Sequence, residues 1–221
     1  MMKCLLHKFS ILPAVILLLA SPLKAQVTKL GASVNEISHF IASDYFKTLS
    51  GEKTSLEMTD TLYHRALKIY DGNTSKALLA LTFATVPYKY VPVVIPVIKL
   101  KVNIPFYAPG DSIFHLKNRH LPRDLFYNSP RDEGGDRDKL AHFFGSAYLA
   151  YTSGIFDFTK IIGIFVEEFE EKFYIQSSAD PRDIAADELG ETFGKALKKE
   201  CRVLPSEVLL TYPLIYFRYN L

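Results

Sequence analysis

Three helical segments with recognisable ends occupy residues 136–200, and they constrain the fold more than any other feature of the chain. Asp136 or Asp138 can cap the first segment, because an aspartate side chain accepts hydrogen bonds from the free N–H groups at a helix start. Thr159 can cap the second, and Asp180-Pro181 begins the third with a cap followed by a proline at the first helical position. The connections between the segments are short, so we predict a compact three-helix unit.

The region before this unit, from residue 26 to about residue 86, also shows helical spacing. Its apolar residues recur mostly three and four positions apart, which predicts two or three amphipathic helices. Asp71-Gly72-Asn73 interrupts the pattern as a turn, and Thr74 or Ser75 is expected to cap a further helix over residues 76–84. Most of the chain is therefore predicted to be helical.

Two segments depart from this pattern and are predicted to be extended. Residues 88–107 are mostly apolar and β-branched, and three prolines remove backbone donors, which favours an edge strand over a helix. The tail, residues 206–221, is also rich in strand-forming side chains, and we expect it to pair with the first segment. The expected fold class is mainly α: a helical domain with a three-helix unit (136–200) plus a small extended or β element (88–107 and 206–221).

Turn-forming residues concentrate between residues 108 and 135, where Pro-Gly, Leu-Pro, Ser-Pro and Gly-Gly pairs occur. This composition is typical of a loop-rich linker, so we place the main internal boundary there. We predict an N-terminal helical and extended region with its linker over residues 26–130. A helical unit with a strand-like tail is predicted over residues 131–221.

The first 25 residues have the composition of a secretory signal peptide. They contain three lysines, no acidic residue, and an apolar run from Ile11 to Ala20 that is too short to span a bilayer. Cleavage after Ala25 is expected, and an uncleaved anchor is the alternative. Cys4 precedes the apolar run, so it does not have the position of a lipidated cysteine. We therefore expect an exported protein in the periplasm or cell envelope, peripheral to a membrane.

Charge and cysteine content argue against a nucleic-acid-binding protein and against a protein stabilised by disulfides. The chain has 26 basic and 24 acidic residues, and loss of the three signal lysines leaves 23 against 24. Such a balance gives no electrostatic reason to expect a nucleic acid as partner. Cys201 is the one cysteine after the signal, so no intramolecular disulfide can form and stability must come from a core.

Polar residues and glycines share one face on each of two predicted helices, because residues three or four apart lie on the same side of a helix. The first helix contributes Asp138, His142, Gly145 and Ser146, and the third contributes Asp183, Asp187, Gly190 and Gly194. Glycines at a helix interface allow close backbone approach. We therefore expect a buried polar cluster in which His142 and Asp187 meet a carboxylate from Glu167, Glu168 or Glu171.

This cluster admits three interpretations. An imidazole with two or three carboxylates has the ligand chemistry of a divalent metal such as zinc, manganese or iron. The same groups can instead act as a general acid and base, with His142, Asp187 and Glu171 as candidate catalytic residues. In the third interpretation, which we favour, His142 binds Asp187 only to fix the helix register, and Asp183 stabilises a helix start.

Three ordered motifs resemble those of VanZ-like proteins: DKLAHFFGSAYLAY, then the acidic helix GIFVEEFEEKFY, then DPRDIAADELG. They follow an Asp-Lys-x-x-His, Glu, Asp-x-x-Ala-Asn/Asp-x-x-Gly order over about residues 136–195, with a closer likeness to an uncharacterised branch of predicted periplasmic lipoproteins. The resemblance marks Asp138, Lys139, His142, Glu167 or Glu168, Glu171, Asp183, Asp187 and Gly190. It implies a cell-envelope setting and no established reaction. VanZ-like proteins are often membrane-embedded, but the apolar run of this acidic helix is too short to span a bilayer.

These features together predict an exported cell-envelope protein with a structural or accessory role at a membrane surface. The expected partner is that surface or an envelope component. The alternative is a metal-dependent or acid/base hydrolase acting on an envelope lipid or glycan. A third hypothesis is a binding module that holds a lipid or a partner against residues 88–107.

Overall fold

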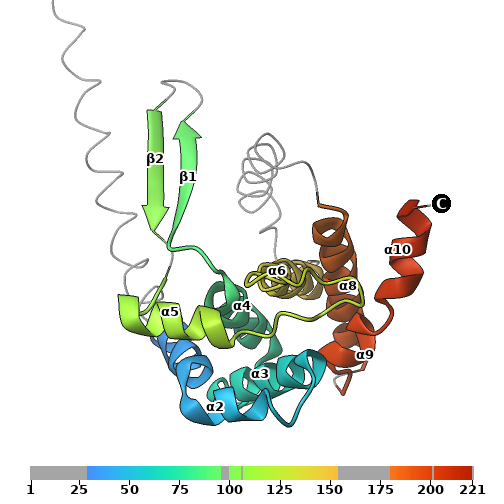
Figure 1. Cartoon of the computed structure of the whole chain (residues 1–221), viewed down its shortest axis with the longest axis horizontal. Helices are drawn as coiled ribbons and strands as arrows, with labels where there is room; N and C mark the ends of the chain where they lie inside the picture. Colours follow the sequence, from blue (N-terminus) through green and yellow to red (C-terminus); the bar gives the residue numbers. More distant parts are fainter. Residues whose placement is uncertain (1–28, 96–99, 106, 154–179, 201, 221) are drawn as a thin grey trace, which may run out of the picture.

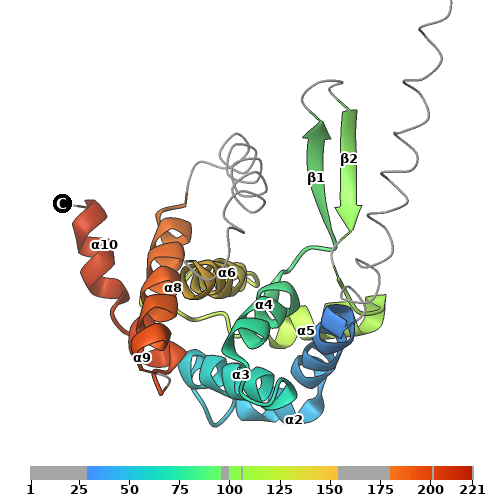
Figure 2. The same cartoon turned by 180° about the vertical axis from the view of Figure 1, so that it is seen from behind.

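The protein is mainly helical, as the sequence predicts (Figures 1 and 2). The computed structural model describes residues 29–95, 100–105, 107–153, 180–200 and 202–220. Residues 29–42 are helical, and the later elements are α2 (Asp44–Leu49), α3 (Ser55–Ile69), α4 (Thr74–Thr85), β1 (Tyr90–Ile95), β2 (Leu100–Pro105), α5 (Asp111–His120), α6 (Lys139–Thr152), α8 (Pro181–Lys199), α9 (Pro205–Leu209) and α10 (Tyr212–Asn220). The helices form the body, and the β1–β2 hairpin projects from it.

Local capping interactions explain where α3 and α4 begin. Thr54 caps α3 through a reciprocal pair with Glu57, whose carboxylate accepts from the Thr54 N–H at 2.8 Å. Asn73 caps α4, because its side-chain oxygen accepts a backbone N–H at 3.1 Å. The predicted cap at Thr74 or Ser75 is therefore wrong, since both residues lie inside the helix.

The starts of α6 and α8 differ in how their aspartates are used. Asp180 caps α8 by accepting from the Arg182 N–H at 3.0 Å, and Pro181 is the first helical residue, as the sequence predicts. Asp138 precedes α6 but makes no capping hydrogen bond. Its carboxylate instead binds the Lys139 ammonium at 2.8 Å.

One hydrophobic core includes helices from both sides of the predicted boundary near residue 130. Phe143 of α6 stacks on Phe193 of α8 with ring centroids 5.3 Å apart, and Tyr63 of α3 meets the Phe193 ring edge-on at 5.3 Å. Other fully buried members of the core are Ile37, Ile41, Phe46, Leu62, Leu78, Leu81, Leu140, Phe144 and Leu189. The described parts of residues 26–130 and 131–221 thus contribute to the same core.

α6 and α8 run in the same direction, side by side. Near their N-terminal ends Lys139 pairs with Asp183, and near their C-terminal ends the Lys198 ammonium donates to the Ser153 carbonyl at 2.6 Å. Equivalent ends of the two helices therefore meet, and side chains at the start of α6 face side chains at the start of α8.

Two glycines allow this close approach. A Cβ atom added at Gly190 would overlap the Phe143 carbonyl, and one at Gly194 would overlap the Ala147 carbonyl. Gly145 differs, because a Cβ there would make an ordinary contact with α4. Backbone contact between α6 and α8 thus requires glycine at 190 and 194.

The C-terminal tail is helical, so the prediction of a strand-like tail over residues 206–221 is wrong. β1 pairs antiparallel with β2 and not with the tail, with Tyr90 opposite Pro105. Pro205 and Pro213 lie in the first turns of α9 and α10, where a helix needs no backbone donor. A proline that suggested a strand edge in the sequence therefore marks a helix start.

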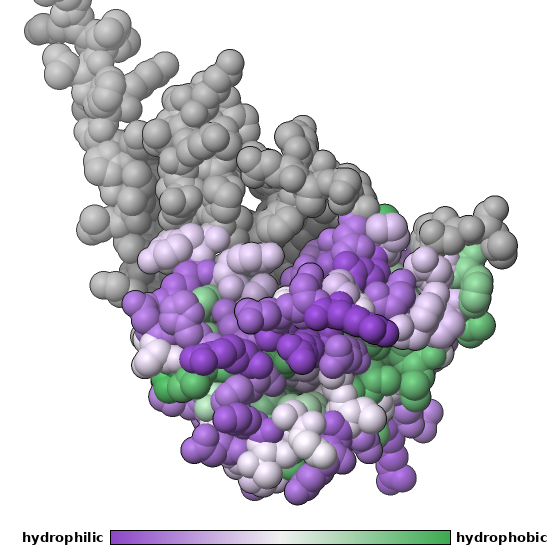
Figure 3. Space-filling model, viewed as in Figure 1, coloured by the Kyte–Doolittle hydropathy of each residue, from purple (hydrophilic) through white to green (hydrophobic). Residues whose placement is uncertain are grey.

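The face of the molecule in Figure 3 is mainly hydrophilic where the chain is described, and hydrophobic surface gathers toward α9 and α10. Leu210, Leu214 and Phe217 are exposed there. None of the helices in the described ranges has the length and apolarity needed to cross a bilayer.

Candidate functional site

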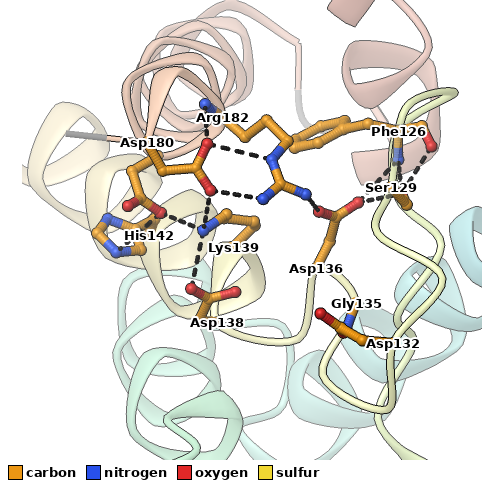
Figure 4. Close-up of polar contacts among 11 residues, drawn as sticks. Phe126, Ser129, Asp132, Gly135, Asp136, Asp138, Lys139, His142, Asp180 and Arg182 are labelled. Atoms are coloured by element: carbon orange, nitrogen blue, oxygen red, sulfur yellow. Dashed lines mark hydrogen bonds and ion pairs between the residues drawn. The ribbon is translucent and has the colours of Figure 1, made fainter. Parts of the chain in front are cut away.

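Charged side chains gather where the N-terminal ends of α6 and α8 meet (Figure 4). The parallel course of the two helices brings these residues together from positions more than forty apart in the sequence. We call them the α6–α8 polar cluster, which consists of Asp136, Asp138, Lys139, His142, Asp180, Arg182, Asp183 and Asp187.

Lys139 lies at the centre of the cluster, and its side chain is only 4% exposed. Its Nζ atom is 2.6 Å from Asp183 Oδ1, 2.8 Å from Asp138 Oδ2 and 3.2 Å from Asp180 Oδ2. Figure 4 shows the Lys139 side chain ending between Asp138 and Asp180. Three carboxylates therefore surround one ammonium, and this satisfies a charge that would otherwise be costly to bury.

These contacts hold Lys139 and Asp180 in their ionised forms. Burial by itself lowers the pKa of Lys139, but hydrogen bonds to Asp138 and Asp183, and their charges, outweigh burial and raise the pKa above its ordinary value. Burial likewise opposes ionisation of Asp180, but hydrogen bonds from Arg182 and the nearby Lys139 charge lower the pKa of Asp180 to about 2. Both groups are charged at neutral pH.

His142 and Ser146 bind the same carboxylate of α8. The His142 Nδ1 lies 3.3 Å from Asp187 Oδ1, and the Ser146 hydroxyl donates to that oxygen at 2.8 Å. The side chains of His142 and Asp187 are 34% and 45% exposed, so water reaches both. The single hydroxyl proton of Ser146 is engaged by Asp187, so Ser146 and His142 are not arranged as a nucleophile and its base.

The imidazole of His142 is held between two carboxylates. Its Nε2 lies 3.6 Å from Asp183 Oδ1, on the side opposite to Asp187. Burial lowers the pKa of His142, but the hydrogen bond to Asp187 and the charges of Asp187 and Asp183 outweigh burial and raise the pKa. The protonated form of His142 is therefore favoured relative to a free imidazole.

A second ion pair extends the cluster to the loop before α6. The guanidinium of Arg182 binds two carboxylates. Nη1 of Arg182 lies 3.0 Å from Asp136 Oδ1, and Nη2 of Arg182 lies 2.7 Å from Asp180 Oδ2. The other oxygen of the fully buried Asp136 accepts from the Ser129 hydroxyl and from the Phe126 N–H. Burial raises the pKa of Asp136, although the Ser129 bond and the Arg182 charge oppose the shift. Arg182 thus ties the start of α8 to this loop.

The structure brings five of the predicted cluster residues together: Asp138, Lys139, His142, Asp183 and Asp187. Glu167, Glu168 and Glu171 lie outside the described residues. The expected contact between His142 and Asp187 is present, with Ser146 on the same oxygen.

Three members of the cluster were missed by reasoning from the sequence. From the sequence, Asp136 and Asp180 are expected only as helix caps, and no role is expected for Arg182. The Asp-Pro-Arg sequence at a helix start was a usable signal, because it places Asp180 and Arg182 in one turn with opposite charges. Nothing in the sequence pairs Arg182 with Asp136, since that contact depends on the position of the loop.

The described part of the cluster does not fit a metal centre. Among the described residues, no group of three or more His, Cys, Asp and Glu side chains is arranged to hold a metal ion. The Lys139 ammonium occupies the space between Asp138, Asp180 and Asp183 that a divalent cation would need. What this part of the cluster offers chemically is charge pairing, together with a solvent-accessible His142–Asp187 pair.

Comparisons with family models, with curated proteins and with solved structures return no match. The VanZ-like resemblance stays a prediction, and a function has to be argued from the sequence and the described geometry.

Proposed function

We propose that this chain is an exported cell-envelope protein with a structural or accessory role at a membrane surface. The observation that carries the structural role is the saturation of Lys139. A lysine ammonium has three donors, and three carboxylates surround this one. It therefore has no donor left for a substrate, and the α6–α8 polar cluster serves to fix the orientation of two helices.

Export and envelope location are supported by the sequence. The first 25 residues combine lysines, no acidic residue and a short apolar run, which is the composition of a secretory signal. The order of motifs that resembles VanZ-like proteins favours the same compartment. Fractionation of cells that express the C-terminally tagged chain tests the location, and recovery of the tag with cytoplasmic markers would contradict it.

A second candidate function is acid/base hydrolysis of an envelope lipid or glycan. The observation that favours it is the His142–Asp187 pair, which is solvent-accessible and has a raised imidazole pKa. A protonated imidazole oriented by a carboxylate can donate a proton to a leaving group, with water as the nucleophile. This route uses no metal and leaves Lys139 in its structural role.

Substitution of His142 distinguishes the two functions. We expect His142→Ala to lower the melting temperature, and to reduce complementation of a deletion strain only to the extent that the protein is destabilised. The matched control is Glu191→Gln, on the exposed side of α8. A His142→Ala protein with wild-type stability and no complementation would favour the hydrolase. Release of fatty acid or of reducing ends from purified envelope material by the wild type, lost in His142→Ala, would establish it.

A further inference from the structure

The helix α5 is attached to the helical body differently from its neighbours. Its one buried apolar side chain, Phe114, is not part of the contiguous hydrophobic core that joins α3, α4, α6 and α8. Among the described elements, α5 makes no extensive contact with another helix. No side chain caps its start, and a helix of 10 residues is marginal by itself in water. Interactions other than core packing must therefore hold α5 in place.

Two hydrogen bonds join α5 to the segment between α4 and β1. The Lys117 ammonium donates to the Val86 carbonyl at 2.8 Å, and the Asn118 amide donates to the Pro87 carbonyl at 3.2 Å. The chain enters the β1–β2 hairpin from this segment and leaves the hairpin toward α5. In Figures 1 and 2, α5 lies below the base of the hairpin. The two hydrogen bonds therefore hold both ends of the hairpin together.

The two ends of α5 are also attached through polar side chains. Near its start, Asp111 forms an ion pair with Lys89, whose ammonium lies 4.9 Å from the centroid of the Phe114 ring. At its end, the His120 Nδ1 lies 3.0 Å from the carbonyl oxygen of Ile41, in the first described helix. The Asp111 side chain is 84% exposed, so its ion pair contributes little to stability. The attachment of α5 depends mainly on hydrogen bonds to backbone carbonyls.

Lys117 carries a charge that its surroundings do not balance. It is 1% exposed, and the partners described for its ammonium are the Val86 carbonyl and the Phe114 ring, whose centroid is 5.1 Å away. Burial by itself lowers the pKa of Lys117 to about 7, with no opposing contribution from a neighbouring charge. The side-chain oxygen of Asn118 is also buried, and no described residue donates a hydrogen bond to it. Both groups would be better solvated if α5 moved away.

Three other titratable side chains lie near this site. Lys89, from the segment before β1, contacts the same Phe114 ring as Lys117 and is itself a cation. Asp111 pairs with Lys89, and His120 binds a backbone carbonyl of the first described helix. Of these groups, Lys117 is the one that is buried. Its ionisation is therefore the one that the attachment of α5 changes most.

We propose that α5 is a proton-sensitive latch, which holds the base of the β1–β2 hairpin against the helical body and detaches when Lys117 takes up a proton. Detachment moves the ammonium into water and breaks the hydrogen bonds to residues 86 and 87. This inference does not depend on the proposed function, because it concerns how one helix is held.

The direction of the pH effect follows from the two protonation equilibria of Lys117. The attached form binds fewer protons than the detached form, because a solvated lysine keeps its proton up to about pH 10. Detachment is therefore increasingly favoured as the pH falls from about 10 to about 7. Below that window both forms are protonated, and the equilibrium stops changing with pH.

Hydrogen exchange followed by mass spectrometry tests the latch on the purified protein. Labelling times are scaled to the chemical exchange rate at each pH. We expect the amides of α5 to exchange through an opening that leaves α8 protected. The equilibrium constant for this opening should rise at least about tenfold between pH 8.5 and pH 6.5, because one linked proton changes it by up to about tenfold per pH unit.

Two substitutions identify the group that takes up the proton. Lys117→Met replaces the amine by an apolar side chain of similar length, so the opening constant of α5 should change less than about twofold between the two pH values. His120→Gln removes the other titratable group that binds α5 to a backbone carbonyl. This variant should keep the pH dependence of the wild type.

Spin labels report whether the hairpin is the element that the latch holds. Lys101→Cys places one label on β2 and Glu191→Cys places the other on the exposed side of α8, with both native cysteines replaced by serine. The distance distribution from pulsed electron paramagnetic resonance should be broader at pH 6.5 than at pH 8.5. Addition of Lys117→Met should make the two distributions equal.

Each other result would overturn the inference. An opening constant of α5 that does not change with pH would remove the proton from the device. Equal protection of α5 and α8 would mean that Lys117 is exposed by global unfolding. Persistence of the pH dependence in Lys117→Met, or its loss in His120→Gln, would make another group the sensor. An unchanged distance distribution would mean that α5 does not hold the hairpin.

Discussion

Two buried lysines in this protein have opposite electrostatic environments. Lys139, in the α6–α8 polar cluster, is 3% exposed and has three carboxylate partners. Lys117, on α5, is 1% exposed, donates to the Val86 carbonyl at 2.8 Å, and lies 5.1 Å from the centroid of the Phe114 ring. Within the described part of the chain, no ion pair joins Lys117 to a carboxylate.

The two lysines show that burial alone does not set a pKa. Burial lowers the pKa of Lys117 to about 7, because a carbonyl and a ring do not replace the lost hydration. Burial acts on Lys139 in the same direction, but its carboxylates reverse the result and raise the pKa. Lys139 therefore stabilises the fold as a cation, whereas the Lys117 ammonium, which binds the Val86 carbonyl at the C-terminal end of α4, is a poorly solvated charge.

The largest expected effect comes from removing the cation of the cluster. Lys139→Met leaves three partly buried carboxylates without their central partner, so we expect a loss of about 3–5 kcal/mol in the free energy of unfolding. Chemical denaturation at pH 7 measures it. Glu191→Gln, which removes an exposed charge from α8, should change stability by less than about 0.5 kcal/mol. A loss below about 1 kcal/mol for Lys139→Met would contradict the structural role of the cluster.

Two glycine substitutions test whether close backbone contact between α6 and α8 stabilises the fold. Gly190→Ala would place a Cβ against the Phe143 carbonyl, and we expect a loss of about 2–3 kcal/mol. Gly145→Ala is the control, because its Cβ would meet only Thr82 Cγ2 at 3.4 Å. Urea unfolding of both variants gives the comparison. Equal effects at the two positions would contradict the packing described between α6 and α8.

Lys117→Met should have the opposite sign from Lys139→Met. It replaces a poorly solvated cation by an apolar side chain of similar length, so we expect a gain of about 1–2 kcal/mol at pH 7. In the wild type, the unfolded chain binds more protons than the native state between about pH 7 and pH 10, so Lys117 makes stability rise with pH in that window.

The same pH window provides the control for Lys117. Lys117→Met should remove its part of the slope between pH 7 and pH 10, whereas Lys195→Met, at a side chain that is 63% exposed, should leave the slope unchanged. An unchanged slope in Lys117→Met would show that this amine is solvated or paired in the native state.

The smallest expected effect is that of His142. Its raised native pKa means that its contribution is fully present below the unfolded pKa of about 6.5 and is lost as the pH rises through the native value. The imidazole is 34% exposed, so solvent screening keeps the contribution near or below about 1 kcal/mol. His142→Ala should cost more stability at pH 5.5 than at pH 8.5. If the stability lost in His142→Ala is the same at both pH values, the imidazole stabilises the fold by packing and not by its charge.

Local signals predicted the helices well where the cap and the apolar spacing agree. α8 begins at Pro181 after the Asp180 cap, and Leu189, Phe193 and Leu197 form its buried stripe. These features depend on residues within one or two turns, so the sequence contains them directly.

The tail was mispredicted because its local signals are ambiguous. Tyr212 and Pro213 suit a strand edge as well as the first turn of a helix. In the fold, the first residue of α10 has a partner far away in the sequence: the Tyr212 ring stacks on Phe126 with centroids 3.9 Å apart. That contact could not be inferred from the tail alone.

About half of the polar cluster was predictable. The faces shared by Asp138 with His142 and by Asp183 with Asp187 follow from helical spacing, and their meeting follows from the glycines that allow close approach. The partners Asp136 and Arg182 were not predictable, because a loop brings them together.

The sequence by itself determined the helical class, the start of α8 and which polar residues share a helix face, because each depends on the period of the helix and on neighbouring residues. Tertiary structure alone decided that Lys139 is a satisfied cation and Lys117 an unsatisfied one. In the sequence the two residues are simply lysines, and only the packed neighbours supply carboxylates to one and a carbonyl to the other.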